Sequence, residues 1–124
     1  MAKNNEENLN TFNVISATTN IVGNINADTD MRIDGILEGD ISSTAKLVIG
    51  NKAVVIGNVT CKNAEVFGQV KGKIVVEELL LLHATAIING DIVTGKFAVE
   101  PDAIFNGNCL MNNNSFNGHK EEQQ

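Results

Sequence analysis

The chain has 124 residues, the length of a single domain. Hydrophobic residues make up 43% of it, yet there is no Trp or Tyr, one Pro and eleven Gly, alongside many Ile and Val. Branched aliphatic side chains of this kind favour β structure. The net charge of −6, with lysines scattered along the chain, argues against binding to nucleic acid, which needs a basic surface.

Residues 1–17 and 112–124 are polar and rich in Asn, and we expect both to form disordered tails. The first segment lacks the basic and then apolar pattern of a secretory signal, and the longest apolar run, residues 79–82, is too short to cross a bilayer. Two cysteines do not make a disulfide framework, so Cys61 and Cys109 are interpreted as free thiols. These features predict a cytoplasmic protein.

A five-residue pattern (apolar, any, Gly, any, apolar) occurs six times in the chain. The separations between its central glycines are 16, 18, 15, 18 and 17 residues, and these glycines are Gly23, Gly39, Gly57, Gly72, Gly90 and Gly107. Residues 31–63 also align without a gap on residues 64–96. Such a short repeat leaves no room for helical hairpins, whereas three short strands joined by tight bends fit well.

We therefore expect an all-β, single-domain β-helix (β-solenoid) of about six coils over residues 18–111, with three short strands in each coil. Alternate residues of a strand face the same side, so the two apolar residues of each pattern should point into the core. The Gly between them indicates a bend, or a place where the backbone crowds the core and a Cβ would clash.

No catalytic, cofactor-binding or metal site is expected. His83 is the only histidine within the repeats, and a lone His at the end of a strand is usually a solvated or hydrogen-bonded bend residue. The acidic residues Asp28, Asp30 and Asp34 do not match the spacing of a calcium-binding loop. There is also no paired-cysteine motif and no glycine-rich loop that opens a helix.

The ends of a β-solenoid expose unpaired backbone groups and a section of apolar core unless a cap covers them. Phe105, in the last coil, is the largest residue at any inward position of the pattern. It either plugs the core or anchors another rod, and the open edge favours association. The expected interface residues lie in the first and last coils: Phe105, Cys109, Val99, Met111, Ile21 and Ile25.

The repeats DGILEGDI, VIGNKAVVIGNV, VFGQVKGKI and INGDI, between short polar tails, resemble those of the bactofilins, a family of bacterial cytoskeletal proteins. The resemblance covers about residues 18–111. It implies a right-handed, three-sided β-helix that polymerises without nucleotide into non-polar filaments in which like ends meet, with Phe105 in the joint. It also implies roles in cell shape, in peptidoglycan-associated processes or in the positioning of other proteins.

Bactofilins often attach to membrane through a short apolar and basic N-terminal segment. This chain departs from that pattern because Glu6 and Glu7 accompany Lys3, so anionic lipid would attract it little. Four apolar residues are left either to insert weakly at the inner face of the membrane or to cover the first coil: Leu9, Phe12, Val14 and Ile15.

Two other functions stay open. One is a left-handed hexapeptide-repeat acyltransferase, whose catalytic His would have to be His83, although the period here wanders between 15 and 18. The other is a monomeric scaffold that binds a partner along one face of the rod. The outward apolar residues that would serve such a partner, or lateral bundling, are Val54, Ile56, Ile87 and Ile104.

Overall fold

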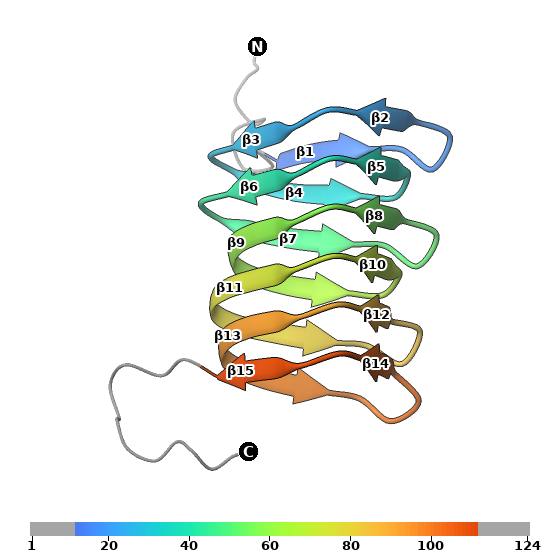
Figure 1. The fold of residues 1–124 in the computed structure, drawn as a ribbon. Coiled ribbons are helices and arrows are strands. Elements are labelled where there is room, and N and C mark those ends of the chain that lie inside the picture. Colours follow the sequence, from blue (N-terminus) through green and yellow to red (C-terminus); the bar gives the residue numbers. More distant parts are fainter. Residues whose placement is uncertain (1–11, 112–124) are drawn as a thin grey trace.

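The computed structural model describes residues 12–111. Within these residues, the secondary structure consists of β-strands and contains no helix. The chain winds six times around a common axis, and each circuit adds one strand to each of three faces (Figure 1). All pairs are parallel and join a strand to its equivalent one coil later. The prediction of a six-coil β-solenoid with three strands per coil is therefore confirmed.

The three faces are named by the order in which each coil visits them. The first face contains β1 (Phe12–Ile15), β4 (Asp30–Ile33), β7 (Lys46–Ile49) and the second halves of β9 (Val59–Val66), β11 (Ile74–Leu82) and β13 (Ile92–Val99). The second face contains β2 (Asn20–Val22), β5 (Ile36–Glu38), β8 (Val54–Ile56), β10 (Gln69–Lys71), β12 (Ile87–Asn89) and β14 (Ile104–Asn106). The third face contains β3 (Ile25–Ala27), β6 (Ile41–Ser43), the first halves of β9, β11 and β13, and β15 (Cys109–Met111).

The core consists of columns of side chains that occupy the same position in successive coils. The column of the second face shows the rule, because its four interior members are completely buried and its two end members are only half-buried: Ile21, Leu37, Val55, Val70, Ile88 and Phe105. Since each residue covers the one before it, an interior coil buries its apolar side chains against both neighbours. Among the described residues, the end coils have a neighbouring coil on one side only.

The repeated glycines mark the tightest approach between coils. All six have a positive φ between +140° and +149°, a conformation that L side chains rarely adopt. A Cβ on Gly57 would lie far inside van der Waals contact with the carbonyl oxygen of Gly39 in the preceding coil. The expected crowding is therefore present, and it runs along the axis of the rod, between coils, rather than across the core.

The ordered rod begins earlier than expected. Residues 1–17 were predicted to form a tail, yet β1 pairs with β4 from Phe12 to Ile15. The reason is that this polar segment ends in a short stretch that can continue the ladder of the first face. The remainder of the predicted N-terminal tail and the predicted tail 112–124 lie outside the described residues.

Gly57→Ala should destabilise the fold more than Gly23→Ala. Both positions have nearly the same φ, so each change costs about 1–3 kcal/mol of backbone strain. A Cβ on Gly23 meets nothing within 4 Å, whereas one on Gly57 meets the backbone of Gly39 and adds an overpacking cost of about 1–3 kcal/mol. Chemical denaturation monitored by circular dichroism measures both. Equal losses would contradict the close approach between coils.

Candidate functional site

The last coil presents an apolar surface at the C-terminal end of the rod. Val99 and Met111 end two core columns and are 48% and 46% exposed, whereas Leu82 and Thr94, their equivalents one coil earlier, are fully buried. Phe105 is half-buried and packs on the core beneath it, while Cys109 is exposed. The predicted residues of this end therefore lie together on one end face.

A second aromatic residue of this end face was not predicted. The ring of Phe97 lies 6.1 Å from that of Phe105, centroid to centroid, at an interplanar angle of 80°. This edge-to-face geometry is favourable for aromatic pairs. Phe97 ends the column of Leu47, Ala64 and Leu80. The signal was present in the sequence, because Phe97 aligns with Leu47 and Leu80 and is again the larger residue in the last coil.

The N-terminal end face is made of smaller side chains. Ile21, Ile25 and Ala27 are half-buried and pack against the core, which places the two predicted residues, Ile21 and Ile25, at this end. Ile15 is only 8% exposed and pairs with Ile33. Of the two roles left open for Ile15, membrane insertion or cover of the first coil, its position agrees with the second, because its side chain belongs to the core.

The other residues proposed for membrane contact have different positions. Val14 points outward from the first face and is exposed. Phe12 lies at the start of β1, and Leu9 lies outside the described residues. Within residues 12–111, no helix is long and apolar enough to span a bilayer.

Two stretches at the ends of the rod, residues 12–27 and 103–111, contain no charged residue. The first of them forms the first coil, and the second completes the last coil. The net charge of −6 therefore resides between and outside these segments. Two end faces can thus approach without a direct like-charge contact from these segments.

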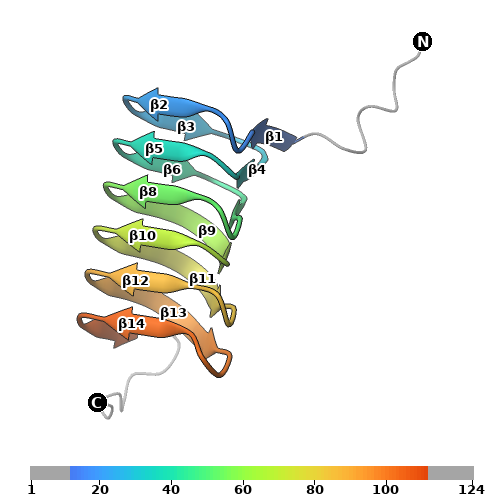
Figure 2. The same cartoon turned by 90° about the vertical axis from the view of Figure 1, so that its right-hand side faces the viewer.

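The four residues predicted to form a lateral stripe all lie on the outer surface of the second face. Val54 and Ile56 come from β8, Ile87 from β12 and Ile104 from β14. Figure 2 shows the strands of this face stacked from β2 to β14. Ile56 and Ile104 are exposed, and Val54 and Ile87 are half-buried. The structure therefore brings these residues onto one surface.

His83 is held in a cluster at the corner between the first and second faces. Its ring stacks on Phe67 with centroids 3.9 Å apart and an interplanar angle of 4°. Its Nδ1 lies 3.1 Å from Oε2 of Glu100, and its Nε2 lies 3.0 Å from Oε1 of Glu65. The pKa of the Glu65 carboxyl is lowered, first by a hydrogen bond from Lys46 and then by the one with His83.

This cluster ties the last coil to the one before it. The Glu100 carboxylate also accepts a hydrogen bond from the backbone N–H of Ala84, at 2.9 Å. Glu100 directly follows Val99 of the end face, so the contact fixes the corner between β13 and β14 within the last coil. His83 thus has both ring nitrogens and one ring face engaged, which is the geometry of a structural contact.

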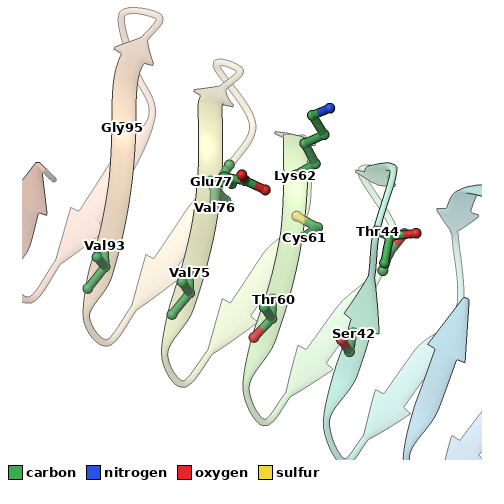
Figure 3. A pocket seen from close by; sticks show the side chains of 11 residues that line it. Ser42, Thr44, Thr60, Cys61, Lys62, Val75, Val76, Glu77, Val93 and Gly95 are labelled. Atoms are coloured by element: carbon green, nitrogen blue, oxygen red, sulfur yellow. The ribbon is translucent and has the colours of Figure 1, made fainter. Parts of the chain in front are cut away.

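A shallow groove of about 460 Å³ runs along the third face and its corner. Outward residues from four successive coils line one side of it, and Figure 3 shows them in a row: Ser42, Thr60, Val75 and Val93. Cys61 also lines the groove, but it is buried, and burial raises the pKa of its thiol to about 12. This thiol is therefore protonated at neutral pH and is a poor nucleophile. Among residues 12–111, no group of His, Cys, Asp and Glu is arranged to hold a metal ion.

The fold and the apolar side chains at its two ends define a β-solenoid protein of the kind that leaves its end coils open to association. The family model Bactofilin, described as polymer-forming cytoskeletal, matches residues 13–110. The chain belongs to the bactofilin family, and the resemblance inferred from its repeats is confirmed.

Two curated relatives come from Myxococcus xanthus. The chain is 32% identical to the bactofilin BacO over 98 residues, which cover 79% of this chain and 78% of BacO. It is 31% identical to the bactofilin BacP over 98 residues, but these span only 41% of that longer protein. Among solved structures, the Thermus thermophilus bactofilin in double helical filaments is similar with a TM-score of 0.76 and 26% identity, covering 80% of this chain and 98% of that one.

Proposed function

We propose that this protein assembles end to end, without nucleotide, into filaments that act as a cytoskeletal scaffold. The observation that carries the proposal is the C-terminal end face, where the core columns end in Phe97, Phe105, Val99 and Met111 and no helix within residues 12–111 covers them. The relative from Thermus thermophilus, which shares the fold, is itself a filament. The proposed role is that of a structural scaffold and does not require catalysis.

The proposed joint between subunits forms where the last coil has unpaired strand edges and exposed apolar side chains. Within residues 12–111, no further strand pairs with the outer edges of β14 and β15, so their backbone groups are available to pair with another edge. A second end face placed there would also remove the exposed apolar atoms of Val99 and Met111 from water. Apolar contact and strand pairing both act without a bound nucleotide.

The joints are proposed to bring like ends together, which makes the filament non-polar. In such a joint, each contact is a two-fold interface in which the same surface is used twice, and the filament alternates between C-terminal and N-terminal contacts. The filament would lie in the cytoplasm, or at the inner face of the membrane. There it would support cell shape, peptidoglycan-associated processes or the positioning of other proteins.

Phe105→Arg should abolish filaments while leaving the rod folded. The guanidinium would have to be buried without a partner in the joint, which costs about 3–5 kcal/mol. Negative-stain electron microscopy without nucleotide or metal gives the readout, with circular dichroism to verify folding. Asn108→Arg, an outward and exposed position of the same coil, is the matched control and should still form filaments. Monodisperse wild-type rods would instead make Phe105 a plug of the core.

Cys109 offers a direct test of polarity. In a Cys61→Ala background, Cys109 is the only cysteine, and diamide should convert the filament subunits into covalent dimers if C-terminal faces meet. In a head-to-tail joint that continues the ladder, Cys109 would instead face position 25 of the next subunit, since both belong to one column. Only a chain that also carries Ile25→Cys would then cross-link, and that result would refute the like-end arrangement.

Membrane contact is proposed to involve Leu9, Phe12 and Val14, because Val14 is exposed beside residues 12–27, which carry no charge. Val14→Asp should therefore reduce co-sedimentation with anionic liposomes. Thr18→Asp, which introduces the same charge at another exposed position, is the control and should sediment like the wild type. Equal sedimentation of all three proteins would refute the proposal that this segment contacts the membrane.

A further inference from the structure

We propose that the segment after the last strand, residues 112–124, turns back over the third face of its own subunit and docks Phe116 in the groove there. The occupant of the groove is therefore a named segment of this chain, and the contact is separate from the end-to-end joint. Phe116 is the only hydrophobic side chain among residues 112–124, which are otherwise polar or glycine.

The outer surface of the third face is apolar only in its last three coils. Its outward residues form one column, in which each residue pairs with its equivalent in the next coil: Asn26, Ser42, Thr60, Val75, Val93 and Leu110. The first three side chains are polar and the last three are aliphatic. Val75 and Val93 are half-buried, and Leu110 is 63% exposed. These three residues, the aliphatic strip, extend from the fourth coil to the last.

The groove follows this strip. Val75, Val93 and Gly95 line it beside the buried Val76 (Figure 3). Its volume of about 460 Å³ falls within the range of pockets that bind small molecules, about 300–1,000 Å³. The charged residues of the described lining are one base and one acid, Lys62 and Glu77. An uncharged segment with one aromatic residue suits such a surface, and residues 112–118 carry no charge.

The chain leaves the fold beside the groove. Met111, the last described residue, pairs with Thr94, and Thr94 directly precedes Gly95 of the groove lining. The next four residues, 112–115, are three Asn and one Ser. These residue types favour turns, because their side chains hydrogen-bond to nearby backbone and Asn tolerates a positive φ. A turn within them would direct the chain back along the rod.

The length of the connection limits how far Phe116 can reach. From Met111 to Phe116 the chain advances five residues, which span at most about 17 Å. Leu110 and Val75 are two coils apart, about 10 Å at the spacing of paired strands. Ser42 is four coils from Leu110, about 19 Å, and is out of range once the chain has turned. The connection therefore confines Phe116 to the aliphatic part of the third face.

One aromatic side chain is sufficient because the contact is intramolecular. A Phe side chain buries about 150–250 Å², far less than the roughly 800 Å² per partner of a stable interface between free molecules. A connection of five residues, however, holds Phe116 near the strip at an effective concentration in the millimolar range. The docked ring covers Val93 and Leu110 and removes their exposed apolar atoms from water.

The absence of Trp from the chain provides the test, because Phe116→Trp makes residue 116 its only tryptophan. The emission wavelength and the quenching by acrylamide measure how exposed this side chain is, with the chain unfolded in guanidinium chloride as the reference. Val93→Glu then places a charge in the aliphatic strip. Ile87→Glu is the matched control, since Ile87 is also a half-buried, outward aliphatic residue of the fifth coil but lies on the second face.

Two further variants complete the experiment. Phe105→Arg, combined with Phe116→Trp, alters the end face and the proposed joint, so that the measurement is also made on single rods over a range of protein concentrations. Circular dichroism verifies that each variant folds. If Val93→Glu does not fold, Val93→Thr takes its place, because it keeps the branched shape and Thr60 already occupies the same column.

We expect a blue-shifted tryptophan that is protected from acrylamide in the Phe116→Trp chain, with or without Ile87→Glu or Phe105→Arg, and at every protein concentration. Val93→Glu should shift the emission and the quenching toward the values of the unfolded chain. An exposed tryptophan in the Phe116→Trp chain, protection that survives Val93→Glu, or equal loss with Val93→Glu and Ile87→Glu would overturn the proposal.

Two other outcomes would overturn it by assigning residue 116 to a different place. Loss of protection with Phe105→Arg would place this residue on the end face, and loss on dilution would place it in the groove of another subunit. None of these readouts depends on whether the wild type forms filaments. A failure of end-to-end assembly would therefore leave the docking of Phe116 unaffected.

Discussion

The whole structure depends on one constraint, which is that every coil must lie on the previous one in register at the spacing of paired strands. The constraint is strictest at the repeated glycines, where the carbonyl oxygen of one coil occupies the space in which a side chain on the next would start. A residue with a Cβ at Gly39 or Gly72 would hold two coils apart and open the columns on either side. Six short segments of otherwise ordinary composition thereby form one continuous hydrophobic core.

The same constraint leaves core side chains exposed at the two ends of the rod, because no further coil covers them there. An interior side chain such as Val55 or Val70 is covered from both directions, while Phe105 is covered from one. The proposed joint is thus the exposed end of the repeated core. In the last coil, two phenylalanines occupy core positions that hold smaller side chains in the earlier coils. The His83 corner is complete within the subunit, and its contacts with Glu65 and Glu100 hold successive coils together.

The β-solenoid could be predicted from the sequence because the same pattern occurs six times, so no single ambiguous copy decides the assignment. The alternation of side chains along each strand then distinguishes core residues from surface residues. That reasoning placed Phe105 and the four lateral residues on the surfaces where the structure has them. It failed where the pattern is not repeated. Phe12–Ile15 precedes the first glycine and has no copy upstream, so its strand was not recognised and Ile15 was assigned to the tail. The stacking of His83 on Phe67 and its contacts with two carboxylates depend on corner geometry, which five-residue patterns do not describe.

Because every coil pairs with its neighbours in the same way, the length of the subunit can change without a change in the residues of its end coils. The ladder of β11 with its neighbours is broken between Val76 and Leu79, and the strands on either side nevertheless pair in register. Corners can therefore gain or lose residues while the columns stay aligned. Duplication of the 33-residue unit would add two coils, about 10 Å, between unchanged first and last coils. Gene duplication could in this way change the distance between successive joints, and hence the repeat of a polymer, without altering how its subunits recognise each other.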